Sequence, residues 1–342
     1  MNKYRAIDLF AGIGGLRLGF EQAFEEDIEF VFASEIFEPA RLVYETNFGE
    51  SPAGDITTID PTSVPDHDIL LAGWPCQSFS IAGRKKGFRD PRGNLFFAIS
   101  NILEAKRPYA FLLENVWHLK RHDKGRTFKK ITKILEDELN YCVYTKVLNA
   151  KHFGVPQNRP RIFLAGFKEP ISFDFPPRST EIPKIKDFLE QDVDVKYYIS
   201  QTYLDGLKKH RKRHEEKGHG FGYKVLDPEG VAHTLVIGGM GRERNLIKDK
   251  TPPANYANGS PERIPNREGL RTLTPKECQS IMGFPPDFQI PVANSHAYRV
   301  LAESVAVPLI AKIAGCMKSA MERKTPAGLL SWSEKSEKLQ QE

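Results

Sequence analysis

The sequence of 342 residues is poor in cysteine, and its cysteines lack the spacing of a metal or disulfide motif. The four cysteines lie far apart, and none forms a CxxC pair: Cys76, Cys142, Cys278 and Cys316. This spacing excludes a disulfide scaffold and a zinc ribbon, and it is typical of proteins from a reducing compartment. We therefore expect no metal ion in the functional site.

Long apolar runs are also lacking, and we expect no secretory leader. No apolar run approaches the roughly 18 to 20 residues that span a bilayer, and the first residues, MNKYRAIDLF, enter a strand-like run directly. We therefore expect a cytoplasmic protein without membrane attachment. Positive and negative charges nearly balance, with 49 Lys and Arg against 44 Asp and Glu. The formal net charge of +5 permits a polyanionic partner but does not require one.

The first half of the chain alternates strand-like and helix-like segments. Apolar strand-like runs occupy residues 4–10, 29–35 and 68–72, and helical patterns or turns separate them. Apolar strands that alternate with helices predict an α/β doubly wound domain, with a mostly parallel sheet covered on both faces.

The composition changes near Pro170. Residues 173–183 and 251–269 are rich in proline and turn residues, and no strand–helix–strand unit repeats there. A clean helical pattern returns only near the C-terminus, where we expect Pro308 to bend one helix over residues 304–317. The chain is thus expected to form one lobe from residues 1–170 plus 296–324, with a smaller, mostly β or irregular lobe inserted at 171–295. Residues 325–342 are expected to form a polar tail.

A glycine-rich turn, DLFAGIGG at Asp8–Gly15, follows the first strand. Its spacing differs from the dinucleotide fingerprint, because Arg17 occupies the position of the third glycine. Glu35, roughly 20 residues further on, closes the second strand, where a carboxylate can accept both ribose hydroxyls. Asp55 follows the next turn. The combination indicates a nucleoside-bearing cofactor, and a nicotinamide-dependent oxidoreductase stays open at this point.

The stretch GWPCQSFS follows the strand at 68–72 and contains a candidate nucleophile. Open α/β sheets bind ligands at the carboxyl ends of their strands, so Cys76 lies where chemistry is expected. A thiolate is the strongest side-chain nucleophile, and the polar, proline-bearing turn is unlike a core segment.

Further chemistry-bearing residues follow in two motifs. Glu114 ends the strand YAFLLE, where partial burial is expected to raise the pKa of its carboxyl group. Gln157, Arg159 and Arg161 alternate along an extended stretch. This period of two predicts that both guanidinium groups share one face.

Taken in order, these motifs resemble the DNA (cytosine-5)-methyltransferase family, in particular the small bacterial enzymes of restriction–modification systems. The resemblance covers nearly the whole chain and includes Gly54-Asp55-Ile56, Asn94-Leu95-Phe96, residues 271–285 (RTLTPKECQSIMGFP) and Ser304-Val305. It implies the methyltransferase fold, S-adenosyl-L-methionine as cofactor, double-stranded DNA as partner, a separate restriction endonuclease and a monomeric enzyme. It also implies that the cofactor site is lined by Phe10, Gly12, Gly14, Gly15, Glu35, Asp55, Ile56, Pro75, Leu95 and Ser304.

The resemblance also implies a mechanism on a cytosine that has been flipped out of the duplex. The Cys76 thiolate would add to carbon 6 of the base, and Glu114 would hydrogen-bond the ring nitrogen and the exocyclic amine. Arg161 would contact the base carbonyl oxygen, while Arg159 would help to hold the geometry of the site.

DNA contacts are expected from two regions. The glycine- and arginine-rich segment 80–92 is expected to close over DNA. For Arg242 and Arg244, contact with guanine edges or phosphates and a surface ion pair with Glu243 are both open. For the basic run 208–214, a solvated helix face and phosphate contact are both open. The expected DNA-contacting residues are Gln77, Ser80, Arg84, Lys85, Lys86, Arg89, Arg242 and Arg244.

Three positions depart from the family pattern. Ala302 and Glu303 replace the usual Gly-Asn of the last motif, and a carboxylate there would either pair with the cofactor ammonium or repel its carboxylate. Ile36 stands where many members place an aromatic residue over the adenine. The alternatives are a tRNA cytosine-5 methyltransferase and a catalytically impaired relative that binds DNA.

Overall fold

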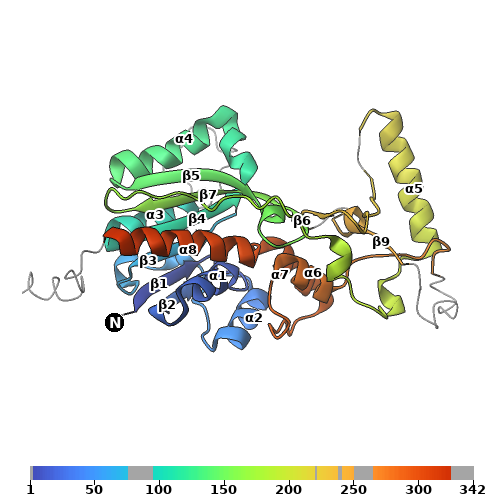
Figure 1. The fold of residues 1–342 in the computed structure, drawn as a ribbon, viewed down its shortest axis with the longest axis horizontal. Helices are drawn as coiled ribbons and strands as arrows, with labels where there is room; N and C mark the ends of the chain where they lie inside the picture. Colours follow the sequence, from blue (N-terminus) through green and yellow to red (C-terminus); the bar gives the residue numbers. More distant parts are fainter. Residues whose placement is uncertain (1–2, 76–94, 220–221, 238–240, 250–264, 325–342) are drawn as a thin grey trace, which may run out of the picture.

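The computed structural model describes residues 3–75, 95–219, 222–237, 241–249 and 265–324. Figure 1 shows a central sheet with helices on its faces at one end of the molecule and helix α5 at the other end. The polar tail predicted at 325–342 lies outside the described residues.

The central sheet has six strands in the order β2-β1-β3-β4-β7-β5. Strands β2, β1, β3 and β4 run parallel, while β7 runs antiparallel to both β4 and β5. Their interiors are apolar because both faces of the sheet are buried. The predicted mostly parallel sheet is therefore confirmed. The strands are β1 Tyr4–Leu9, β2 Ile28–Ser34, β3 Ile69–Gly73, β4 Ala110–Val116, β5 Cys142–Asn149 and β7 Pro160–Phe167.

Helices cover both faces of this sheet (Figure 1). On one face, α1 (Gly15–Phe24) and α8 (Val307–Lys324) bury apolar side chains in a core shared with β1 and β7. On the other face, α3 (Leu95–Lys106) and α4 (Arg126–Lys133) do the same. Full burial of each large aliphatic side chain contributes ~1.5–3 kcal/mol, so the two cores fix the sheet between its helices.

The part of the chain between β7 and α8 is largely irregular apart from three α-helices. Its described strands are two residues long: β8 pairs with β6, which lies just before β7, and β9 pairs with β10. Helices α6 and α7 pack against α2 (Glu38–Phe48) in a third core, which includes Val43, Ile281 and Leu301. The elements are β6 Gln157–Asn158, α5 Gln201–Glu216, β8 Ala232–His233, β9 Ile247–Lys248, β10 Leu270–Arg271, α6 Pro275–Met282 and α7 Asn294–Glu303.

The helix predicted over residues 304–317, with a bend at Pro308, begins only at Val307 as α8. Pro308 therefore lies in its first turn, where a missing N–H costs nothing, and the predicted bend is wrong. The preceding helix, α7, ends at Glu303. Residues 294–323 together are long and apolar enough to cross a membrane, but 67% of the most apolar window is buried inside the molecule. The stretch therefore behaves as core helices.

Arg159 connects this helix break to two other parts of the chain. Its side chain is 2% exposed and lies between β6 and β7. Nη2 donates to the carbonyl of Ala302 at 2.8 Å and to that of Ser304, and Nη1 donates to the carbonyl of Leu235 at 3.3 Å. The carbonyls at the end of a helix have no partner within it. Arg159 thus satisfies carbonyls that the end of α7 leaves open.

Substitution of Arg159 by methionine is expected to destabilise the fold. The change preserves most of the side-chain bulk but leaves three buried carbonyls without their donor, at ~1–3 kcal/mol for each group left unsatisfied. We expect the free energy of unfolding, measured in urea, to fall by about 3 kcal/mol or more. The matched control is Arg126→Met, which removes an exposed ion pair with Asp123 and should cost under ~1 kcal/mol. Equal losses in the two variants would contradict this account.

Asp8 introduces a pH dependence into the core. It is fully buried in β1, directly before the glycine turn. Burial raises the pKa of its carboxyl group from 3.8 to about 8, and the nearby Arg17 opposes this only in part. The folded state holds this proton more tightly than the unfolded state does. The protonated carboxyl group therefore stabilises the fold fully below pH 3.8, the unfolded-state pKa, and this stabilisation is lost as the pH rises through about 8.

The Asp8→Asn variant should therefore lose part of the pH dependence of stability. Between pH 4 and pH 8, the parent should lose up to ~1.4 kcal/mol of unfolding free energy per pH unit through this one group. The neutral amide cannot ionise, so the stability of the variant relative to the parent should improve steadily with pH. Urea unfolding at several pH values measures this difference, and a difference independent of pH would refute a protonated Asp8.

Candidate functional site

The predicted site residues gather at one edge of the sheet because four neighbouring strands are parallel. The carboxyl ends of β1, β2, β3 and β4 all lie at this edge, and Gly73 pairs with Glu114 across β3 and β4. A Cβ atom on Gly73 would lie 3.5 Å from a Glu114 carboxylate oxygen, so the two strand ends are in close contact. The edge thus joins the glycine turn to the reacting residues.

The turn after β1 needs glycine for both conformation and space. Gly12 and Gly14 have φ of 56° and 81°, which disfavour other residues. A Cβ on Gly14 would come within 2.2 Å of the Phe48 ring, and one on Gly15 within 2.7 Å of the Ser304 hydroxyl. A Cβ on Gly12 would meet no described heavy atom within 4 Å. The turn is therefore packed tightly on one side and open beside Gly12.

Glu35 is fixed over this open turn. Its two carboxylate oxygens accept hydrogen bonds from the backbone N–H groups of Gly12 at 2.8 Å and Phe37 at 2.7 Å. Each oxygen keeps a lone pair for a ligand hydroxyl. Backbone hydrogen bonds between Ala53 and the end of β2 bring Asp55 to the same edge. The two carboxylates and the open turn fit a nucleoside-bearing cofactor.

The other predicted cofactor residues occupy the same edge. Phe10 begins the turn with φ of 54°, and Leu95 begins α3. Pro75 is exposed after β3, whereas Ile56 is buried in the core beneath the edge. Ser304 follows α7 and lies against Gly15. All of these residues except Ile56 retain some contact with solvent or line the glycine turn.

Glu303, where the chain departs from the family pattern, already has a cationic partner. Both of its carboxylate oxygens lie 3.4 Å from Nε of Arg299, whose guanidinium group sits 3.9 Å from the centre of the Phe37 ring. Burial raises the pKa of Glu303, Arg299 opposes the rise, and Glu35 adds to it. Glu303 therefore lies within electrostatic range of Glu35, and Arg299 offsets part of its charge. Ile36 is 72% exposed beside them.

Of the two residues predicted to act on the base, the structure describes Glu114, whereas Cys76 lies outside the described residues. The Glu114 side chain is buried at the end of β4, and Nε of Arg161 donates to its carboxylate at 2.9 Å. Burial raises the pKa of Glu114, while Arg161 and Arg159 lower it. The predicted raised pKa is thus confirmed. Gln77, Ser80, Arg84, Lys85, Lys86 and Arg89 also lie outside the described residues.

The alternating residues of the QNRPR motif separate into two environments. Both guanidinium groups are within electrostatic range of Glu114, as the shared face predicts, but Arg161 alone forms an ion pair with it. Gln157 is buried further along and bonds the backbone of Ile281 and Leu235, each at 3.3 Å. Gln157 and Arg159 therefore connect the sheet to the inserted region.

Asn115 is a site residue that the sequence analysis did not single out. Its side chain is buried, and Nδ2 donates to the carbonyl of Trp74 at 2.8 Å. Its Oδ1 accepts from the N–H of Val116. Asn115 thereby holds the backbone two residues before Cys76 against the end of β4. Its position directly after Glu114 was the available signal.

In the inserted region, the structure decides one open alternative. Arg242 and Arg244 are exposed on a short 3-10 helix, Arg242–Asn245, and Arg242 lies 5.1 Å from the centre of the Tyr298 ring. Glu243 is buried instead and accepts a hydrogen bond from the Tyr203 hydroxyl at 2.8 Å. The suggested surface ion pair with Glu243 is therefore wrong, because alternate residues of this turn face opposite sides.

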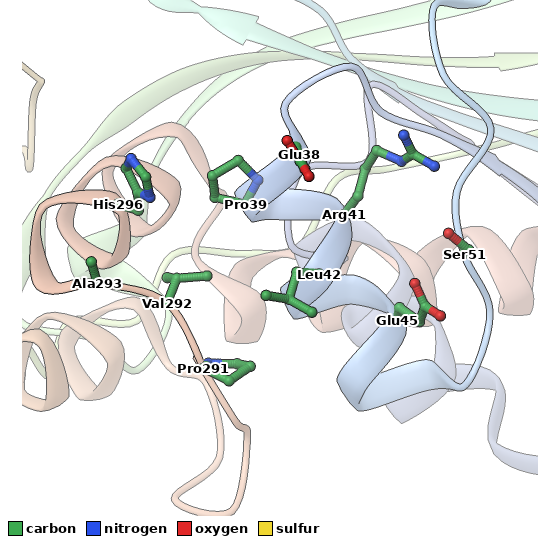
Figure 2. Close-up of a pocket in the computed structure, with 10 residues that line it drawn as sticks. All are labelled: Glu38, Pro39, Arg41, Leu42, Glu45, Ser51, Pro291, Val292, Ala293 and His296. Atoms are coloured by element: carbon green, nitrogen blue, oxygen red, sulfur yellow. The ribbon is translucent and has the colours of Figure 1, made fainter.

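A surface groove of about 570 Å³ lies away from these residues. Figure 2 shows its lining from α2, including Glu38, Arg41 and Glu45, and from the segment that ends at His296. None of the sequence-predicted site residues lines it. The candidate site is therefore the strand edge and not this groove.

Comparison with known proteins agrees with this arrangement. The family model described as C-5 cytosine-specific DNA methylase matches residues 4–319. The chain is 47% identical over 320 residues to the type II methyltransferase M.HpaII of Haemophilus parainfluenzae, covering 90% of this chain and 87% of that protein. It is 46% identical to the type II methyltransferase M.NlaX of Neisseria lactamica, covering 93% and 97%.

Solved structures show the same fold at low sequence identity. The Entamoeba histolytica methyltransferase EhMeth superposes with a TM-score of 0.74 at 21% identity, covering 95% of this chain and all of that chain. A Spodoptera frugiperda DNMT2 variant superposes with a TM-score of 0.72 at 22% identity, covering 92% and 100%. With the family model matching almost its full length, the chain belongs to the C-5 cytosine-specific DNA methylase family.

Proposed function

We propose that this S-adenosylmethionine-dependent cytosine-5 methyltransferase modifies a flipped-out cytosine within a specific duplex DNA sequence, and thereby protects DNA from a separate restriction endonuclease. The observation that carries the proposal is the buried Glu114–Arg161 pair, at the strand edge where Cys76 follows β3. The restriction–modification role rests on the names of the relatives, which are type II methyltransferases. We also propose that the enzyme acts as a cytoplasmic monomer.

The cofactor would lie over the open glycine turn. Glu35 would accept the ribose hydroxyls through the lone pairs left free by the Gly12 and Phe37 N–H groups. The Asp55 carboxylate would accept a hydrogen bond from the adenine amino group. The cofactor supplies the electrophilic methyl group when bound. The remaining contacts would come from Phe10, Gly14, Gly15, Ile56, Pro75, Leu95 and Ser304.

The protein side chains would activate the base. The Cys76 thiolate would form a bond to carbon 6, which moves electron density to carbon 5. Glu114, with its raised pKa, would share a proton with the ring nitrogen as negative charge develops there. After methylation, loss of the carbon 5 proton returns the electron pair to the ring and expels the Cys76 thiolate. Arg161 would orient Glu114 and contact the base carbonyl oxygen.

The division of labour would follow the two parts of the chain. Residues 1–170 plus 296–324 would hold the cofactor and the reacting groups, and residues 171–295 would recognise the target. The exposed Arg242 and Arg244 support this assignment, because Glu243 bonds the Tyr203 hydroxyl and pairs with neither arginine. The segment that begins at Gln77 would contact DNA next to Cys76.

Label transfer from radiolabelled S-adenosylmethionine tests the proposal. The parent enzyme should label plasmid DNA at one sequence, identified by bisulfite sequencing, and should leave tRNA unlabelled. Glu114→Gln should lower the rate of label transfer by ~100-fold or more, because the amide keeps the shape but cannot share a proton in the same way.

Asp68→Asn is the matched control for the Glu114 variant. Asp68 is another carboxyl group whose pKa is raised by burial, and it caps the N–H of Arg5 at the opposite edge of the sheet. This variant should transfer label at close to the parent rate. Equal loss in both variants, or label in tRNA but not in DNA, would overturn the proposal.

A further inference from the structure

One strongly basic segment of the chain is not used by the proposed mechanism. Residues 120–133, here called the basic segment, carry seven Lys or Arg residues and one acid, Asp123. Their net charge of +6 exceeds the +5 of the whole chain, so the rest of the chain is close to neutral. The cations are Lys120, Arg121, Lys124, Arg126, Lys129, Lys130 and Lys133.

All seven cations are exposed. They lie on a 3-10 segment, Trp117–Gly125, and on α4, whose inward face buries Thr127 and Ile131. Asp123 pairs with Arg126. Within the described residues, no ion pair involves Lys124, Lys129 or Lys133. Packing therefore explains the inward face of α4, but it does not explain an outward face of a single sign.

The basic segment starts beside the candidate site. Its 3-10 part follows β4 directly, at the same strand end as Glu114. Strand β5 runs parallel to β4, since β7 is antiparallel to both, so α4 crosses from the site edge to the far edge of the sheet. The acidic residues Glu136, Asp137 and Glu138 come only after that crossing. The positive charge therefore begins at the site edge and continues along α4, which lies in the outer layer in Figure 1, and the acidic residues follow it at the far end.

We propose that the basic segment binds the phosphate backbone of duplex DNA that flanks the target cytosine. The inference rests on the proposed function, and it adds a surface that positions the duplex without reading its sequence. A row of exposed cations binds a polyanion such as DNA favourably, because each phosphate that they neutralise releases a condensed counterion. The contacts should therefore supply affinity that falls steeply with salt.

The test is the salt dependence of DNA binding by Lys124→Gln/Lys129→Gln/Lys133→Gln. Fluorescence anisotropy with a labelled duplex several helical turns long measures Kd between ~50 and 200 mM salt. Each lost phosphate contact should reduce the slope of log Kd against log salt by ~0.9, so the slope should fall by about 2 to 3. The kcat for methyl transfer at saturating DNA should stay at the parent value.

The matched control removes three cations from the opposite face of the sheet. Lys146, Lys312 and Arg323 lie around Cys316 on the α8 side and are exposed. Lys146→Gln/Lys312→Gln/Arg323→Gln changes the net charge equally and should keep the parent slope. Thermal unfolding of both triple variants checks that each one folds.

Several outcomes would overturn the inference. An unchanged slope in the basic-segment variant, or an equal reduction in the control, would remove this surface from DNA binding. Loss of tRNA binding with duplex binding intact would assign the surface to RNA instead. Failure of the proposed function is a separate result, because it would show as a parent enzyme that transfers no label to DNA.

Discussion

The arrangement of the site depends on the buried ion pair between Glu114 and Arg161. Burial raises the pKa of the Glu114 carboxyl group, and Arg161 limits that rise while fixing one carboxylate oxygen at 2.9 Å. Removing one member of such a pair leaves an uncompensated buried charge and costs ~3–5 kcal/mol. The pair is possible because β7 runs antiparallel to β4, so that the first residues of β7 lie beside the last residues of β4. A parallel strand would bring its opposite end there.

In the proposed mechanism, the same edge of the sheet would bind both the cofactor and the base. Glu35 is held by the turn after β1, and Glu114 by the strand that follows β3 in the sheet. The C-terminal part of the chain closes this arrangement, since Ser304 lies against Gly15 and its carbonyl accepts from Arg159. Arg159 thus links the helix break to the strand that carries Arg161.

The sequence predicts the parts of the site that depend on local pattern. The apolar run before the glycine turn that ends at Gly15, and the run that ends at Glu114, each identify a strand and its carboxyl end. Because the carboxyl ends of parallel strands lie at the same edge of a sheet, these two ends are predicted to lie close together. Contacts between distant segments are not encoded in this way. The three carbonyl partners of Arg159 lie 76, 143 and 145 residues away, and no periodicity reveals them.

The remaining differences have local physical causes. The apolar spacing of Val305 and Leu309 suits a helix that begins at residue 304, but it cannot show that the helix starts only at Val307. Alternate residues of the short 3-10 helix face opposite sides, so Glu243 is buried. The order of charges in the sequence suggests instead that Glu243 lies at the surface beside two arginines. The basic segment escapes notice in the sequence because an amphipathic helix over a sheet is expected to have a charged outer face.

The most direct test of the account is a covalent trap on the base that Glu114 is proposed to hold. A duplex with 5-fluorocytosine at the mapped target, incubated with enzyme and cofactor, cannot lose its carbon 5 substituent as a proton. Mass spectrometry of the digested complex should therefore find the oligonucleotide bonded to the peptide that contains Cys76. An intact methylating enzyme that forms no adduct, or an adduct on another residue, would contradict the account.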